Sequence, residues 1–201
     1  MECPYPVVWV TENRHGVPGC LRQVLQQYLD KTTEYTRVLM TFGICGQATL
    51  VLQTKEFKLV FPRVDDSTSL LLDSSARKAA YQRESPALFL TSGWLNSERG
   101  IERELEHLDK KYSKPRATRL QQQMYGEFRR LCLIDTGGYS LETILERRST
   151  ISKRLHLGNQ ISEGNLSLPK KLLTGPWGDD LVQIAEYSEV LASHGGPDHW
   201  P

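Results

Sequence analysis

The sequence predicts an α/β protein with a three-layer, Rossmann-like open sheet, mostly parallel, with helices on both faces. Short apolar runs recur, as in strands buried on both faces of a parallel sheet. These runs are Val7 to Val10, Val38 to Met40, Leu59 to Phe61, Leu88 to Leu90, Leu131 to Ile134, and Leu181 to Ile184. Helical patterns separate several of them. Strands that alternate with helices indicate parallel strands with right-handed crossovers.

Apolar spacing predicts three helices. The first follows Pro18, a residue that suits a first helical turn. Its apolar face consists of Val17, Leu21, Val24, Leu25 and Tyr28. The second carries Ile101, Leu105, Leu108 and Tyr112, and the third runs from about Pro115 to Phe128. The stretch from Gly158 to Pro169 has weak periodicity and is expected to be a loop or a small appended element.

The length predicts a single domain, and the nearly balanced charge predicts no general attraction to nucleic acid or membrane. At 201 residues the chain can bury a core of its own. We expect a single α/β domain over residues 1–193 and a flexible C-terminal tail over residues 194–201. Lys and Arg together exceed Asp and Glu by one, 25 against 24, so no overall field recruits nucleic acid or membrane.

The four cysteines point to a reducing compartment. None is paired in a Cys-x-x-Cys spacing, and no secretory leader precedes them. No apolar run approaches the roughly 18 residues that a membrane-spanning helix needs. We therefore expect a cytoplasmic protein that does not enter a membrane.

Polar loops follow most of the predicted strands. Ligands of open α/β sheets bind beyond the carboxyl ends of the strands. The loops there are Thr11 to Gly16, Gly43 to Gln47, Pro62 to Ser67, Thr91 to Trp94, and Asp135 to Tyr139. If the strands are parallel, the loops share one rim. The candidate site is therefore expected around Cys45, Arg63, Asp65, Asp66 and Asp135.

Cys45 is the candidate nucleophile or metal ligand. It lies between Gly43 and Gly46 at an expected strand-to-helix turn, where helix amides would stabilise a thiolate. His15 faces the same inferred rim and would ligate a transition metal with Cys45 or act as an acid or base. The alternative is that Cys45 is a small residue in a tight turn and His15 a hydrogen-bonding loop residue.

Arg63, Asp65 and Asp66 place a permanent cation beside two carboxylates. Such a group grips an anion, holds a metal or supplies a base. The competing interpretation is structural: Asp66 or Ser67 caps the next helix, and Arg63 pairs with Asp65 to hold the loop.

Asp135, Thr136 and Gly137 form a second candidate, in which an acid precedes backbone amides that could face an anionic group. The alternative is a glycine turn ahead of a helix that Ser140 caps. Trp94 is a candidate for stacking on a ligand, although a tryptophan at a sheet edge is more commonly buried.

A basic cluster lies near the third helix. It consists of Lys110, Lys111, Lys114, Arg116, Arg119, Arg129 and Arg130. The cluster lacks interleaved aromatics and a nucleic-acid docking motif, so a solvated face that meets an acidic partner is favoured over nucleic-acid binding.

Taken in order, the strand-end motifs resemble those of the domain-of-unknown-function family 1638. The matching segments are His15 to Pro18, Phe42 to Gly46, Pro62 to Asp66, Leu70 to Leu72, Phe89 to Trp94, Glu104, Lys111-Tyr112, and Ile134 to Gly137 with Tyr139. The resemblance spans about Val8 to Ile184. The chain departs from the family pattern at Gln47 and Ser67, where an asparagine and a cysteine are common, and at Leu72-Asp73-Ser74, where glycine-serine is usual.

The resemblance implies a setting rather than a reaction. Members of the family are often encoded near corrinoid-dependent methyltransferases, which implies a role near one-carbon transfer. Because Ser67 replaces the second cysteine, a thiolate pair is not possible here, and a metal would rely on Cys45 with His15 or carboxylates.

Two hypotheses follow. The first is a small-molecule, cofactor or metal-binding protein, including an enzyme of methyl-group metabolism, with its site around Cys45. There Arg63 would neutralise an anion, and Asp65, Asp66 or Asp135 would bind metal or act as base. The second is a non-catalytic accessory module that docks on a methyltransferase or corrinoid protein through Arg116 and Arg119.

Overall fold

The computed structural model describes residues 3–10, 18–98 and 100–195. The chain divides into two compact units. Unit 1 comprises Met1–Ser75 with Leu166–Pro201, and unit 2 comprises Ala76–Asn165. Unit 2 is therefore inserted in the sequence of unit 1. The expectation of one domain over residues 1–193 stays a prediction.

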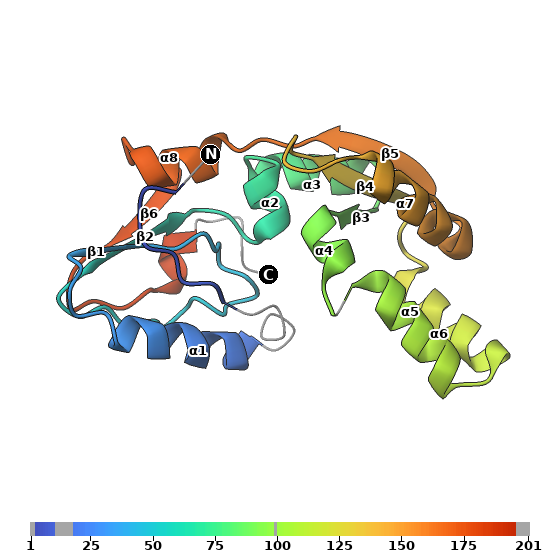
Figure 1. The fold of residues 1–201 in the computed structure, drawn as a ribbon, viewed down its shortest axis with the longest axis horizontal. Coiled ribbons are helices and arrows are strands. Elements are labelled where there is room, and N and C mark those ends of the chain that lie inside the picture. Colours follow the sequence, from blue (N-terminus) through green and yellow to red (C-terminus); the bar gives the residue numbers. More distant parts are fainter. Residues whose placement is uncertain (1–2, 11–17, 99, 196–201) are drawn as a thin grey trace. The chain divides into compact units, whose positions relative to one another are not determined.

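Unit 1 contains a three-stranded sheet in the order β1-β2-β6 (Figure 1). Strand β1 (Arg37–Leu39) is parallel to β2 (Lys58–Pro62), and β6 (Leu181–Ile184) is antiparallel to β2. Because β6 runs in the opposite direction, its first residues lie at the same end of the sheet as the last residues of β2, with Leu181 opposite Pro62.

Helices cover both faces of this sheet. Leu59 and Phe61 point to one face of β2, and they pack in one core cluster with the apolar side of α1 (Pro18–Asp30). Val60 points to the other face, in a cluster with α8 (Ser167–Thr174) and with Leu70 of α2 (Ser67–Leu71). The alternation along β2 is that of a strand buried on both sides. Each fully buried side chain of this kind contributes about 1.5–3 kcal/mol.

The connection out of unit 1 and the return to it are joined by one side chain. Asp73 has φ 65°, a left-handed conformation that favours glycine. Its Oδ1 accepts hydrogen bonds from Ser167 Oγ (2.6 Å) and from the Leu168 amide (3.2 Å) at the start of α8. The Asp73 carboxylate thus caps the start of α8 from a distant part of the sequence.

Unit 2 contains a wholly parallel sheet in the order β3-β4-β5. Its strands are β3 (Ala87–Leu90), β4 (Arg130–Asp135) and β5 (Gly158–Glu163). The helices of this unit are α3 (Ser75–Glu84, which begins on the last residue of unit 1), α4 (Ser92–Asn96), α5 (Ile101–Lys111), α6 (Lys114–Tyr125) and α7 (Glu142–Leu155).

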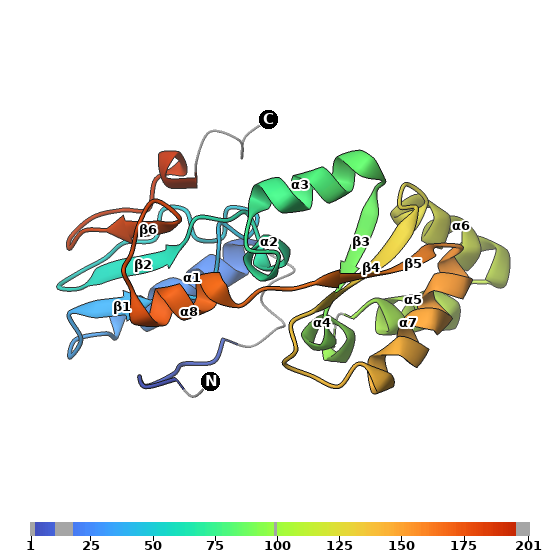
Figure 2. The same ribbon diagram turned by 90° about the horizontal axis from the view of Figure 1, so that it is seen from above.

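The two faces of the β4 strand meet different helices (Figure 2). Leu131 and Leu133 pack in one cluster with the apolar residues of α4, α5 and α7. On the other face, the α3 residue Tyr81 meets Phe89 edge to face, with centroids 5.9 Å apart, and its hydroxyl lies 2.8 Å from Ser162 Oγ.

The α/β class is confirmed, and so are the three predicted helices, which correspond to α1, α5 and α6. Five of the six apolar runs form strands. The run Val7–Val10 was wrongly predicted: residues 3–10 contain no strand, and Trp9 is 84% exposed. A single Rossmann-like sheet of three layers is not confirmed, because the described strands form two sheets, one of them mixed.

The stretch from Gly158 to Pro169 contains β5 and the start of α8. The weak periodicity has a physical cause, because β5 lies at the edge of its sheet and most of its side chains are exposed. Of the expected tail 194–201, His194 and Gly195 end a 3₁₀ helix, Ala192–Gly195, and the remaining residues lie outside the described part. No helix in the described ranges is long and apolar enough to cross a membrane.

Candidate functional site

The loops that follow β1 and β2 are bound to each other at the carboxyl end of the unit 1 sheet. The Ile44 amide donates to the Val64 carbonyl (2.8 Å), and the Cys45 amide donates to the Asp65 carbonyl (2.7 Å). The two bonds extend the parallel pairing of β1 with β2 past the ends of both strands. The structure therefore brings Cys45 together with the loop Arg63–Asp66, as the sequence predicts.

Gly43 makes this approach possible. A Cβ atom at this position would lie 2.3 Å from the Val64 carbonyl oxygen, so only glycine fits without movement. The following residues have positive φ, 46° for Cys45 and 62° for Gly46. A non-glycine residue in this region costs on the order of 1–3 kcal/mol, and such strain is often found at functional sites.

The expectation of a helix after Cys45 is wrong. Residues 45–51 form successive turns, so the chain does not continue from Cys45 into a helix. Cys45 is partly exposed and packs against the core of unit 1. The turn therefore presents the thiol through its backbone conformation.

Arg63 binds the C-terminal part of unit 1 rather than serving Asp65. Its Nε donates to the Asp179 carbonyl (2.8 Å), and its Nη1 donates to the His194 carbonyl (2.5 Å). Its backbone amide donates to the Asp180 carbonyl (2.9 Å). Arg63 thus fastens the start of β6 and the 3₁₀ helix to the end of β2.

The same contacts bring an imidazole to this end of the sheet. His194 Nδ1 accepts a hydrogen bond from the Leu191 amide (2.9 Å), which leaves Nε2 to carry the proton of the neutral ring. Partial burial, together with the nearby Arg63 charge, lowers the pKa of His194 below 6.5. The ring is therefore neutral at pH 7.

The two adjacent acids hold turns. Asp66 is the N-cap of α2, and its Oδ1 accepts from the Ser69 amide (2.9 Å), as the structural interpretation of the sequence predicts. Asp65 Oδ1 accepts a hydrogen bond from the Ser75 hydroxyl (2.9 Å). The Asp65 backbone amide in turn donates to Ser75 Oγ (3.2 Å). Both carboxylates are partly buried.

This end of unit 1 thus combines four kinds of reactive group: a thiol, a guanidinium, carboxylates and a neutral imidazole. In the described ranges no group of three His, Cys, Asp or Glu side chains has the spacing of a metal site. His15, the expected second ligand, lies outside the described residues. The donor set fits thiol chemistry.

The second group of candidate residues lies in unit 2, at the carboxyl ends of β3 and β4. Asp135 ends β4, and its Oδ1 accepts from the Gly137 amide (2.9 Å), which forms a tight turn with Gly137 at φ 68°. The neighbouring loop is held as well, since the Gly164 amide donates to the Asp135 carbonyl (2.6 Å). Convergence of Asp135 with Cys45 stays a prediction, because they belong to different units.

Thr136 lies in this turn, and Trp94 lies on α4, the helix that follows the neighbouring strand β3. Trp94 follows Thr91, the cap of α4, and its side chain is 43% exposed rather than buried at the sheet edge. Tyr139 donates from its hydroxyl to the Ile134 carbonyl, and burial together with Asp135 raises its pKa. Ser140 does not cap α7, because the N-cap position is Leu141 and no side chain bonds there.

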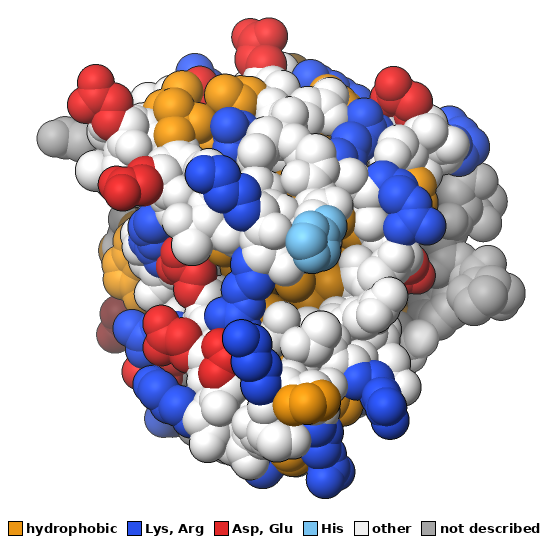
Figure 3. Space-filling view, turned by 90° about the vertical axis from the view of Figure 1, so that its right-hand side faces the viewer, with side chains coloured by type: hydrophobic (Ala, Val, Ile, Leu, Met, Phe, Trp, Pro, Cys, Tyr) orange, Lys and Arg blue, Asp and Glu red, His pale blue; other side chains and the backbone are white. Residues whose placement is uncertain are grey.

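The basic cluster separates into two parts. Arg130 binds Glu84 and the Tyr81 carbonyl, and Arg129 binds the Gly126 carbonyl, so these two cations stabilise unit 2. On the other part, the Arg116 guanidinium lies 4.8 Å and the Lys111 ammonium 5.6 Å from the centre of the Tyr112 ring. Figure 3 shows Lys and Arg side chains spread over this side of the molecule, with Asp and Glu side chains among them.

Sequence reasoning missed His194 and the Asp179-Asp180 pair. His194 is 131 residues from Arg63, so no local pattern links them. One signal was present: if the run Leu181–Ile184 is antiparallel to Leu59–Phe61, the acids before it reach the end of β2. The direction of a strand cannot be read from an apolar run alone.

Comparison with known proteins gives one result. No curated protein and no solved structure matches the chain. A family model, described as a protein of unknown function (DUF1638), matches residues 9–173 and so includes Cys45, the Arg63–Asp66 loop and Asp135. The chain therefore belongs to the DUF1638 family.

Proposed function

We propose that the protein binds a small molecule or cofactor at the carboxyl ends of β1 and β2, with Cys45 as the reacting or ligating group. The observation that carries this proposal is the pair of backbone hydrogen bonds between the two loops, Ile44 to Val64 and Cys45 to Asp65. They fix the thiol beside a loop that carries a cation and two acids. A thiol in a strained, partly exposed turn next to charged groups has the surroundings of a reactive cysteine.

The roles follow from the contacts. Arg63 uses Nε and Nη1 for carbonyls, which makes it a positioning residue for the loop and leaves little of it for an anion. His194 is neutral and carries a proton on Nε2, so it is the group suited to exchange protons with a bound ligand. Asp65 orients the turn through Ser75.

The family resemblance supplies the setting of the proposal: a cytoplasmic Rossmann-like protein that works near corrinoid-dependent methyl transfer or one-carbon metabolism. A thiol suits this setting, because thiolates accept alkyl groups and bind soft metals. Asp135, Thr136, Gly137 and Trp94 would contribute if their loops meet the same ligand.

Selective alkylation tests the site, with Cys20 as the matched control. Cys20 is also partly exposed and belongs to the same unit, but it lies on α1. We expect iodoacetamide to modify Cys45 about tenfold faster than Cys20 at pH 7, because activation requires a larger thiolate fraction. If the protein binds a metal, elemental analysis after purification without oxygen should find that metal in Cys20→Ser and not in Cys45→Ser. Equal alkylation rates with no metal would refute the proposal.

A second function is favoured by the charge of the α5–α6 hairpin. Residues 110–126 contain five cations and no acid. Tyr112 holds Arg116 and Lys111 by cation–π contacts, which reduces the entropy that these side chains lose on docking. This surface suits a non-catalytic module that docks on the acidic face of a methyltransferase or corrinoid protein.

Charge reversal distinguishes the two functions. The Arg116→Glu/Arg119→Glu double variant should associate more slowly with a purified corrinoid protein, and its association rate should no longer depend on salt concentration. Cys45→Ser should bind as the unmodified protein does. Lys170→Glu, an exposed reversal on α8, is the control. Equal binding by all three variants would exclude the docking function.

A further inference from the structure

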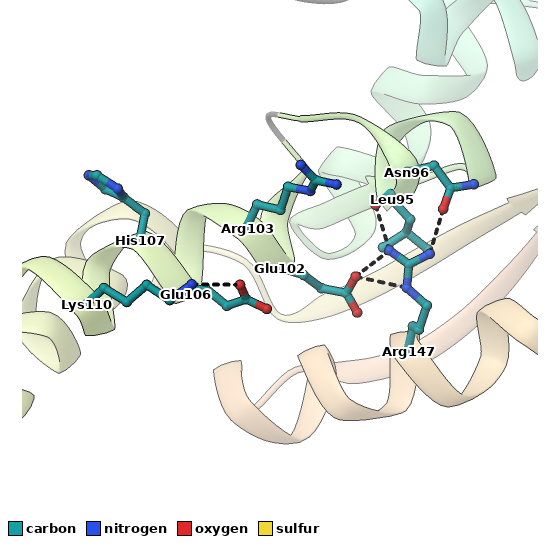
Figure 4. A pocket seen from close by; sticks show the side chains of 8 residues that line it. All are labelled: Leu95, Asn96, Glu102, Arg103, Glu106, His107, Lys110 and Arg147. Carbon is teal, nitrogen blue, oxygen red and sulfur yellow. Dashed lines mark hydrogen bonds and ion pairs between the residues drawn. The ribbon is translucent and has the colours of Figure 1, made fainter.

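A groove on unit 2 lies apart from the thiol site of unit 1 and shares only Lys110 with the basic cluster. It has a volume of about 600 Å³, within the range of small-molecule sites, about 300–1,000 Å³. Residues from α4, α5 and α7 form its walls (Figure 4). They are Leu95, Asn96, Glu102, Arg103, Glu106, His107, Lys110 and Arg147.

One end of the groove is held rigid by Arg147. Its Nε donates to Glu102 Oε2 (2.9 Å), its Nη1 to Asn96 Oδ1 (2.7 Å), and its Nη2 to the Leu95 carbonyl (2.7 Å) and Glu102. A single guanidinium therefore ties three helices together. Such a wall is in place before a ligand arrives, which reduces the ordering cost of binding.

The charges of the groove leave one cation uncompensated. Arg147 is paired with Glu102, and Lys110 lies 3.6 Å from Glu106. Within the described part of the chain, no acceptor bonds to the Arg103 guanidinium. The Lys110–Glu106 pair is loosely held, since its side chains are 80% and 61% exposed, and exposed pairs are worth little.

The cations lie on one stripe of α5. Arg103, His107 and Lys110 follow at helical spacing, and Figure 4 shows the Arg103 and His107 side chains leaving the same side of the helix. The Glu102 carboxylate and the Asn96 amide lie toward α7. One part of the groove thus offers N–H donors to an anion. In the other part the second oxygen of Glu102, Oε1, does not take the bonds from Arg147 and is the acceptor for a hydroxyl group.

We propose that this groove binds a small hydroxylated organic anion. Arg103 is the principal ligand of its carboxylate or phosphate group, and Lys110 and His107 assist. A guanidinium presents paired N–H donors that match two oxygens of either group. The site lies entirely in unit 2, so it is independent of the thiol site proposed for unit 1.

Nuclear magnetic resonance titration of the whole chain tests the proposal. The probes are glycerol 3-phosphate and lactate, each a hydroxylated anion, with sodium chloride at matched ionic strength as the blank. We expect at least one probe to shift the signals of Arg103 and His107, and the better probe identifies the anionic group. Arg103→Gln should weaken binding about 10- to 100-fold, the effect of a lost charged hydrogen bond.

Arg83→Gln is the matched control, because it removes the same charge from an exposed position on α3 outside this groove. It should bind the probe as the unmodified protein does. Two outcomes would overturn the proposal: neither probe shifts these signals, or the two variants lose affinity equally, which would indicate unspecific attraction.

Discussion

Replacing Gly43 by alanine should separate the loops that carry Cys45 and Asp65. The new Cβ would stand 2.3 Å from the Val64 carbonyl oxygen and 2.8 Å from its Cγ2, about 1 Å inside ordinary contact. Overpacking of this kind costs about 1–3 kcal/mol, and each of the two adjacent loop-to-loop hydrogen bonds contributes about 0.5–1.5 kcal/mol. The expected loss of stability is therefore roughly 2–6 kcal/mol.

Urea unfolding followed by circular dichroism measures this loss. For a chain of this length it corresponds to a fall in Tm of roughly 4–24 °C. Alkylation of Cys45 should become faster at the same time, because the turn opens. Gly19→Ala is the control: it lies in α1 of the same unit, and its Cβ would meet nothing within 4 Å. If both variants unfold within about 0.5 kcal/mol of each other, the close approach at Gly43 is not a determinant of the loop pair.

Three further outcomes follow from the contacts. Asp66→Ala should cost about 1 kcal/mol because α2 loses its cap, whereas Asp66→Asn should cost less, and urea unfolding compares them. The pKa of His194 is lowered in the folded state, so the stability that depends on its neutral ring is complete above pH 6.5 and is lost as the pH falls below that value. Unfolding between pH 5 and 8 should show this loss in the parent protein but not in His194→Gln. Burial raises the pKa of Cys132 to about 11, so a disulfide reagent at pH 8 should modify it only after unfolding, and equal rates in native and denatured protein would contradict that burial.

The central strands could be predicted from sequence because their partners leave a local signature. Leu59 to Phe61 and Leu131 to Ile134 are continuously apolar since both faces are covered. The edge strand β5 carries no such signature, because its exposed side chains are free to be polar. The run Val7–Val10 is equally apolar but pairs with no strand, so an apolar run alone was not enough to predict a strand there.

The approach of the loops after β1 and β2 could be predicted, because it follows from the direction of the two strands. The loops after β1 and β2 meet because the two strands are parallel neighbours, and Asp66 caps α2 because it precedes the helix. The partners of Arg63 could not be predicted, since they depend on the antiparallel return of β6. The groove beside Arg147 depends on the packing angles of three helices, which no residue spacing specifies.

The hydrogen bond between Asp73 and Ser167 joins the segments that precede and follow the inserted unit 2. During synthesis, the ribosome must produce all of Ala76–Asn165 before α8 and β6 exist. At about 5–20 residues per second, this delay is on the order of ten seconds. Throughout it, the nascent β2 strand has its β1 neighbour and α2, but it lacks α8, which later completes the cover of Val60. A chaperone that shields this incompletely covered apolar face would therefore act during translation, before α8 has been synthesised.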